Sequence, residues 1–198
     1  VHLEEGKNRN KINRTNSTLN EILNIEKNKI STHYNNNSSW DKVKKFSNEY
    51  EFIYTSSYAN DYKNISNITP VSRSFFKLWE IINNYDDIIP LNTDNLKTAH
   101  IAEGPGGFIE CLCDYFNMYQ NTGSMYGITL KSSNKKIPSW KLPKHLFENN
   151  AINLYENDDG NIYNIKTVHT FIEFVGEKSC DFVTSDGGFD FSANFNNQ

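Results

Sequence analysis

The fold of this chain is decided by the stretch Thr98-Ala99-His100-Ile101-Ala102-Glu103-Gly104-Pro105-Gly106-Gly107-Phe108-Ile109. Its first five residues predict a buried strand over 98–102, and the glycine-rich turn that follows leads into apolar residues at helical spacing. Glycines let a backbone approach a ligand, and a helix N-terminus offers amide groups to an anion, so this order indicates a nucleotide-type site. A tight corner between strand and helix, without a ligand, would leave the same pattern.

The glycine spacing argues against dinucleotide binding. Ile109 stands where the third glycine of G-x-G-x-x-G belongs, and Gly127-Ile128-Thr129-Leu130-Lys131, at the tip of the second predicted strand, contains no acidic residue. A site for NAD is therefore not favoured.

The flanking sequence alternates between helical and strand patterns in the order typical of a parallel α/β sheet. The further predicted elements are a helix capped by Ser72 with Phe75, Phe76, Trp79, Ile81 and Ile82 on its apolar side, strands over 125–130, 151–154 and 181–184, and a helix over 165–175. We expect a Rossmann-like α/β fold over residues 71–198.

Residues 1–70 differ in composition and are expected to form a polar Asn/Lys-rich extension with short helices. Thr18 and Glu21 fit a capping box before an apolar face, which predicts a helix near 18–29. A second helix is predicted to begin near Ser39.

Composition limits the protein class. A chain of 198 residues is the size of one domain with an extension, and its formal net charge of -4 argues against a globally basic nucleic-acid binder. The sequence contains no apolar run long enough to span a bilayer, and its first residues do not resemble a signal peptide, so we expect an intracellular protein, cytoplasmic or nuclear. Cys111, Cys113 and Cys180 suit neither a disulfide framework nor a four-ligand zinc site, and are predicted to be buried thiols.

Two charged residues stand beside the predicted site. Asp186 ends the fourth strand and precedes Gly187 and Gly188, where it either acts on a ligand or caps a Gly-Gly turn. Lys77 lies on the helix before the first strand, where a solvated surface lysine is the simple alternative.

Taken together, these motifs resemble the FtsJ-like (RrmJ-type) family of S-adenosylmethionine-dependent RNA ribose 2′-O-methyltransferases. The resemblance covers roughly residues 71–198 and is carried by Ser72-Arg73-Ser74-Phe75-Phe76-Lys77-Leu78-Trp79-Glu80-Ile81 and by Ala102-Glu103-Gly104-Pro105-Gly106-Gly107-Phe108. Three later stretches look like the branch that methylates the first transcribed nucleotides of capped mRNA. They are Gly127-Ile128-Thr129-Leu130-Lys131, Gly160-Asn161-Ile162-Tyr163-Asn164 and Asp181-Phe182-Val183-Thr184-Ser185-Asp186-Gly187-Gly188-Phe189-Asp190.

The resemblance assigns roles to particular residues. The family uses a Lys-Asp-Lys-Glu catalytic tetrad, whose first lysine maps to Lys77 and whose aspartate maps to Asp186; the later lysine and glutamate have no counterpart. We therefore expect a domain truncated after the fourth strand and inactive as a 198-residue piece. The residues expected to bind S-adenosylmethionine are Glu103, Gly104, Pro105, Gly106, Gly107, Phe108, Thr129 beside the ribose, Asn161 beside the adenine, and Asp186.

The implied reaction is direct displacement, in which a ribose hydroxyl attacks the methyl group of a sulfonium. Such a reaction requires alignment and an ammonium near the hydroxyl, and no metal. For RNA we expect contacts from Arg73, Lys131, Lys135 and Lys136. Lys131, Lys135 and Lys136 belong to a lysine run that continues through Lys141 and Lys144, together with Trp140, which could stack a base, and His145. A solvated lysine-rich loop, and an ion pair of Arg73 with Glu80 or Asp86, remain alternatives.

Three functions stay open. The first is a cap-type RNA 2′-O-methyltransferase, and the second is an FtsJ-like enzyme on structured RNA. The third is an inactive S-adenosylmethionine-binding or protein-binding remnant that assists other subunits of a capping complex. The Asn-, Lys-, Ile- and Tyr-rich composition fits an AT-rich genome, including that of a large DNA virus.

Overall fold

A computed structural model describes residues 17–34, 66–85, 87–90, 93–135 and 137–188. The chain divides into two compact units, one formed by residues 1–51 and 189–198 and the other by residues 52–188. Each unit is described separately.

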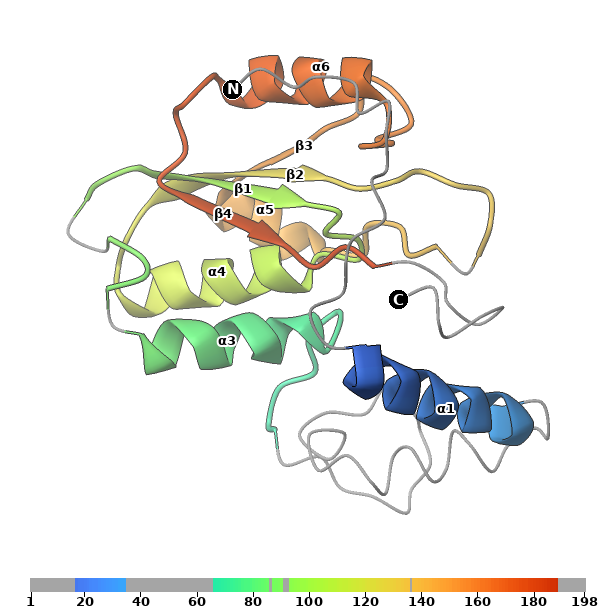
Figure 1. Cartoon of the computed structure of the whole chain (residues 1–198). Coiled ribbons are helices and arrows are strands. Elements are labelled where there is room, and N and C mark those ends of the chain that lie inside the picture. Colours follow the sequence, from blue (N-terminus) through green and yellow to red (C-terminus); the bar gives the residue numbers. More distant parts are fainter. Residues whose placement is uncertain (1–16, 35–65, 86, 91–92, 136, 189–198) are drawn as a thin grey trace. The chain divides into compact units, whose positions relative to one another are not determined.

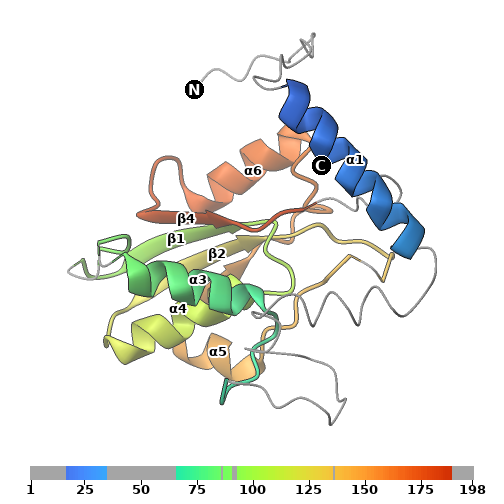
Figure 2. The ribbon, with the colours of Figure 1, turned by 60° about the horizontal axis from the view of Figure 1, so that its bottom comes forward.

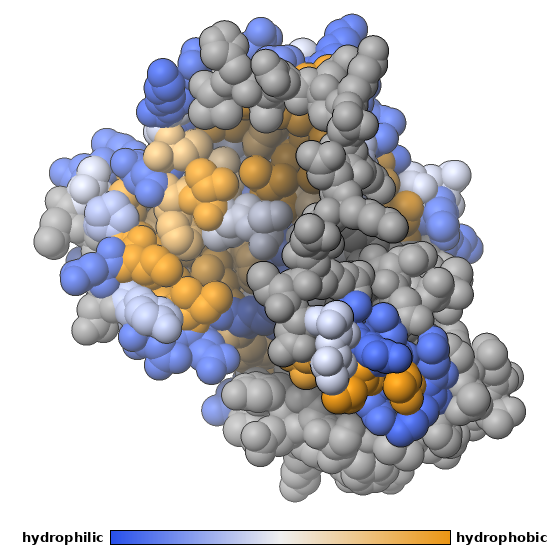
Figure 3. Space-filling model, in the orientation of Figure 1, coloured by the Kyte–Doolittle hydropathy of each residue, from blue (hydrophilic) through white to orange (hydrophobic). Residues whose placement is uncertain are grey.

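In the first unit, the described part is one helix, α1 (Ser17–Tyr34). The predicted helix near 18–29 is thereby confirmed, but Thr18 lies inside the helix and does not cap its start. The apolar side chains that suggested a buried face are 48% to 62% exposed at Leu19, Ile22, Leu23 and Ile25, and Figure 3 shows hydrophobic residues at the surface of this helix among hydrophilic ones. The helix predicted near Ser39 lies outside the described residues.

The second unit contains a parallel four-stranded sheet in the order β3-β2-β1-β4 (Figure 1). The strands are β1 (Leu96–Ile101), β2 (Gly123–Ile128), β3 (Ala151–Leu154) and β4 (Phe182–Ser185). All four predicted strands are confirmed to within a few residues. Helices connect consecutive strands of a parallel sheet and cover its two faces. β1 lies between β2 and β4 in this sheet and is buried on both faces.

Helices cover both faces of the sheet (Figures 1 and 2). The bounds of these helices are α3 (Ser74–Asn84), α4 (Gly107–Met118), α5 (Lys144–Asn149) and α6 (Ile165–Val175). On one face, α4 packs against the sheet and α3 packs on α4, around a core that includes Phe75, Ile109 and Met125. On the other face, α6 buries Phe171 and Val175 against Ala99 and Ile128. The predicted Rossmann-like α/β fold is thereby confirmed.

Three local predictions were wrong. Helix α3 begins after Arg73 with no side-chain cap, so Ser72 is not its capping residue. Ile81, expected on the apolar side of that helix, is 41% exposed. The six-residue helix α5 was missed, because its sequence was interpreted as part of a lysine-rich loop.

The three cysteines are free thiols, and the prediction that they are buried is confirmed for Cys111 and Cys113 but not for Cys180, which is half-buried. Burial raises the pKa of the Cys113 thiol to about 12. No helix within the described residues is long and apolar enough to cross a membrane.

Candidate active site

Lys77 on α3 and Asp186 just after β4 meet near the carboxyl ends of the strands, although they are 109 positions apart. The Lys77 ammonium donates to both oxygens of the Asp186 carboxylate, at 2.8 Å to Oδ1 and 2.9 Å to Oδ2. Their side chains are 60% and 32% exposed, so this ion pair is open to solvent. In an open α/β sheet, this edge is where ligands bind.

Lys77 reaches this position because the start of α3 is fastened to the start of α4. The backbone amide of Val71 donates to Glu110 Oε2 at 2.7 Å. A Cβ on Gly107 would collide with the hydroxyls of Ser72 and Ser74 and would lie 2.9 Å from the Phe75 nitrogen. Only glycine at position 107 therefore permits this close packing, which holds the first turn of α3 beside the glycine-rich turn.

The glycine-rich turn is also fixed from the other side. Gly104 donates its amide to Thr129 Oγ1 at 3.1 Å, and a Cβ on Gly104 would lie 2.5 Å from both that hydroxyl and the Pro138 carbonyl oxygen. Lys141 donates its backbone amide to the Pro105 carbonyl at 3.0 Å. The backbone of this turn thus approaches its own chain closely, and the Thr129 hydroxyl is already engaged.

Glu103 lies beneath the turn and is 2% exposed. Its carboxyl accepts a 2.5 Å hydrogen bond from the Phe108 amide at the start of α4. Burial, with a smaller contribution from Asp186, raises its pKa to about 7, although the Phe108 hydrogen bond and Lys77 act in the opposite direction. A carboxyl of this chain therefore occupies the helix N-terminus that the sequence suggested as an anion site.

The loop after β3 lies against the end of β2. Asp158 accepts hydrogen bonds from the Gly160 amide at 2.8 Å, the Thr167 hydroxyl at 2.7 Å and the Tyr155 hydroxyl at 3.0 Å. Burial acts to raise the pKa of Asp158, but these hydrogen bonds outweigh it and lower the pKa. The backbone amide of Lys131, just after β2, donates to the Asp159 carbonyl at 2.7 Å. This hydrogen bond joins the end of β2 to the loop that follows β3.

Comparisons with known proteins agree with this architecture. Residues 70–198 match the family of FtsJ-like methyltransferases. The chain belongs to the FtsJ-like methyltransferase family. A relative from Acanthamoeba polyphaga mimivirus, "Uncharacterized protein L511", is 27% identical over an alignment of 165 residues that covers 74% of this chain and 20% of that protein. The chain thus spans about a fifth of the length of this relative, and no solved structure matches it.

The structure places several residues that the FtsJ-like resemblance assigned to the cofactor. Gly104, Pro105, Gly106 and Gly107 form the turn, and Phe108 packs into the core at 6% exposure. Asn161 lies at the strand ends, where its side-chain oxygen accepts from the Tyr163 amide at 3.0 Å. Their contact with a cofactor remains a prediction.

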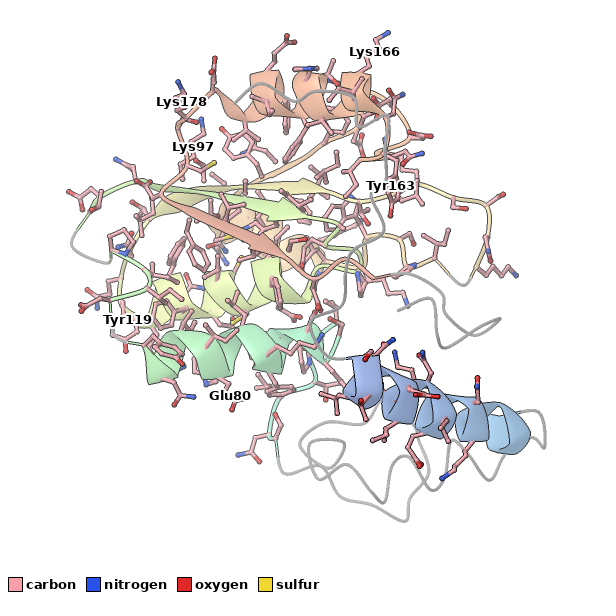
Figure 4. The ribbon with its side chains drawn as sticks, in the orientation of Figure 1. Glu80, Lys97, Tyr119, Tyr163, Lys166 and Lys178 are labelled. Carbon is pink, nitrogen blue, oxygen red and sulfur yellow. The ribbon has the colours of Figure 1, made fainter. Side chains whose placement is uncertain are left out.

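The residues predicted to contact RNA are partly outside the described chain. Arg73, Lys131 and Lys135 are exposed, whereas Lys136 and Asp86 lie outside the described residues. Trp140, which could stack a base, is half-buried, and its ring packs against Gly127 and the α4 core. A stacking role for it remains a prediction. Tyr163 is an exposed aromatic residue for which the sequence predicted no role. It is 74% exposed, and Figure 4 shows it near the carboxyl ends of the strands.

Four contributors to the site were missed from sequence. Glu110 accepts the Val71 amide ahead of α3, Ser72 and Ser74 pack against Gly107, and Asp158 orders the loop after β3. The Glu110 contact could not be predicted because its partner is 39 positions away, and the roles of the other three match no sequence motif. A groove of about 720 Å³ between α3 and α4 includes neither Lys77 nor Asp186 in its lining.

Proposed function

We propose that this chain is the cofactor-binding part of an RNA 2′-O-methyltransferase that acts on the first transcribed nucleotides of capped mRNA. The observation that supports it most is the Lys77–Asp186 ion pair at the carboxyl edge of the sheet. Family membership supports a methyltransferase and S-adenosylmethionine as its cofactor. The choice of capped RNA rests on the resemblance of the strand-end motifs to the cap-specific branch.

The residues at this edge fit a cationic cofactor. The Asp186 carboxylate carries a negative charge and its side chain is partly exposed, so a cation can reach it. When bound, S-adenosylmethionine supplies a methyl carbon that bonds to the ribose 2′-oxygen while the carbon–sulfur bond breaks, the sulfur keeps the electron pair, and the hydroxyl proton passes to water.

The roles of the protein residues follow from this placement. The Lys77 ammonium stabilises negative charge that develops on the 2′-oxygen, because a fixed positive charge lowers the energy of an incipient alkoxide. Asp186 orients Lys77 through two hydrogen bonds. The turn from Gly104 to Gly107, held by Thr129 and by the start of α3, keeps the site in one geometry, which reduces the entropy lost on alignment.

The test uses the longest polypeptide that the gene encodes. Methyl transfer from radiolabelled S-adenosylmethionine is measured to four short RNAs: capped, uncapped, capped with 2′-deoxyribose at the first two nucleotides, and a folded hairpin without a cap. We expect label on the capped RNA with unmodified ribose alone. The capped RNA with 2′-deoxyribose at the first two nucleotides should receive no label. Label on the deoxyribose substrate would rule out 2′-O transfer to these nucleotides, and label on the hairpin alone would replace capped mRNA by structured RNA as the substrate.

A further inference from the structure

Glu103 is a buried acid beside the ion pair, and the mechanism above does not use it. It follows β1 directly, its carboxyl is tied to the Phe108 amide at 2.5 Å, and only 2% of the residue is exposed. Ala102, its neighbour, lies against Gly187, since a Cβ on Gly187 would be 3.0 Å from the Ala102 Cβ. The segments that carry Glu103 and Asp186 are therefore packed side by side.

Charged groups from two elements act on this carboxyl: Asp186 follows β4, and Lys77 lies on α3. The Cys111 thiol on α4 also lies near it, since Glu103 contributes to raising the pKa of that thiol. Burial is the largest influence and raises the pKa of Glu103 to about 7, compared with its ordinary value of 4.5. A glutamate in this position changes its charge near neutral pH, whereas an ordinary glutamate is already ionised there.

The charge state of Glu103 decides the net charge of the centre. Lys77 and Asp186 neutralise each other, so the three residues together are neutral when Glu103 holds a proton and carry one negative charge when it does not. A negative centre attracts a cation more strongly than a neutral one does, and the attraction is largest where burial lowers the effective dielectric constant.

We propose that Glu103 is a positioning residue of this centre whose charge sets how strongly the site prefers a sulfonium ligand over its uncharged thioether product. The inference rests on the proposed function, because it assumes that S-adenosylmethionine binds at this edge. Ionised Glu103 favours the charged donor, and protonated Glu103 reduces that preference.

The two ligands provide a direct measurement. S-adenosylmethionine and S-adenosylhomocysteine share their base, ribose and amino-acid groups and differ in the methyl group and its charge, so other effects of pH largely cancel in the ratio of their dissociation constants. Calorimetry on the 198-residue chain should show that this ratio shifts toward S-adenosylmethionine by about fivefold between about pH 6 and pH 8. Glu103→Gln, which keeps an oxygen to accept from Phe108, should show a constant ratio.

The matched control is Asp114→Asn. Asp114 is another part-buried acid on α4, and burial raises its pKa too, but it is not among the charges that act on Glu103. This variant should retain the pH-dependent ratio. Binding of both ligands with a ratio independent of pH in the unaltered chain would overturn the inference alone, whereas failure of both ligands to bind would overturn the proposed function together with it.

A second measurement does not depend on a ligand or on Glu103→Gln folding. The carbon-13 shift of the Glu103 carboxyl should titrate with a midpoint near 7. Asp186→Asn should lower this midpoint and Lys77→Met should raise it, because each removes one of the charges that act on the carboxyl. A midpoint that both variants leave in place would show that Glu103 is only a structural cap of α4.

Discussion

Two polar clusters link β4 to distant parts of the second unit, and they differ in solvent exposure. The first is the Lys77–Asp186 ion pair just beyond the strand end, with side chains 60% and 32% exposed. The second lies inside the sheet, where the His100 ring in β1 bonds to Thr98 Oγ1 at 2.9 Å and to Thr184 Oγ1 in β4 at 2.7 Å, and all three residues are buried.

Exposure determines what each cluster can contribute. An exposed ion pair adds little to stability because water screens it, yet it stays accessible to a ligand. A buried neutral cluster has no access to ligands, but breaking it leaves unpaired polar atoms in the core, which is costly. The ion pair should therefore matter for catalysis and the histidine cluster for the pairing of β1 with β4.

The largest effect is expected from Lys77→Met. Methyl transfer to the capped RNA should fall by about 100-fold to 1000-fold, because the charge that stabilises the 2′-oxygen is lost. The free energy of unfolding, measured by urea denaturation, should change by less than about 1 kcal/mol.

The control for this variant is Lys178→Met. Lys178 is an exposed lysine 3.9 Å from Glu177, and Figure 4 shows it at the opposite end of the sheet from Tyr163. Its replacement should leave transfer unchanged. An equal loss of transfer in both variants, or a large loss of stability in Lys77→Met, would contradict the contrast between the clusters.

The buried cluster is tested by His100→Leu. Both threonine hydroxyls lose their partner, so the free energy of unfolding should fall by about 3 kcal/mol in urea denaturation. His169→Leu, at an exposed position on α6, should stay within about 0.5 kcal/mol of the unaltered chain. If both changes had the same small effect, the His100 cluster would not hold β1 and β4 together.

The connection between α3 and α4 is tested by Gly107→Ala. The added methyl group would displace Ser72 and Ser74, and we expect a loss of about 2 kcal/mol in the free energy of unfolding. Gly188→Ala introduces the same methyl group where no described atom lies within 4 Å, and should have much the smaller effect on stability. The reverse order would show that the close packing at Gly107 is not needed.

The smallest effect is a pH dependence. Burial lowers the pKa of His100 to about 3 from its ordinary value of 6.5, so the unfolded chain binds a proton before the folded protein does. The histidine contribution to stability is therefore lost as pH falls below about 6.5, by roughly 1 kcal/mol per pH unit.

This pH contribution is isolated as the difference in the free energy of unfolding between the unaltered chain and His100→Leu. Both are measured by urea denaturation at a series of pH values. Subtraction is needed because Glu103, with its raised pKa, gives a slope of opposite sign between about pH 4.5 and about pH 7. A difference that does not vary with pH would mean that the folded and unfolded chains bind a proton at His100 equally well, so that burial does not lower the pKa of this ring.

The elements that carry strong local patterns could be predicted from sequence. The apolar run of β1, the helical spacing of α6 and the glycine-rich turn each follow from residues close together in the chain. The meeting of Lys77 and Asp186 was expected only from the family resemblance together with the rule that ligands bind at the carboxyl edge.

Contacts set by tertiary packing could not be predicted. Helix α5 is only six residues long, which is too short for a periodic pattern. The partial burial of Trp140 depends on Gly127 in β2, because a side chain at position 127 would collide with the Trp140 ring. The hydrogen bond from the Phe108 amide to Glu103 could not be predicted either, because the family resemblance assigned Glu103 to the cofactor and said nothing of its partner in the chain.

That arrangement has a consequence for nucleotide chemistry. In dinucleotide-binding proteins a pyrophosphate sits at the helix start that Glu103 occupies here. A phosphate brought to this place would have to displace a carboxyl group from its amide and, above neutral pH, would meet its negative charge. Affinity matrices bearing ATP or NAD should therefore fail to retain the second unit through this turn, even though its glycines resemble theirs.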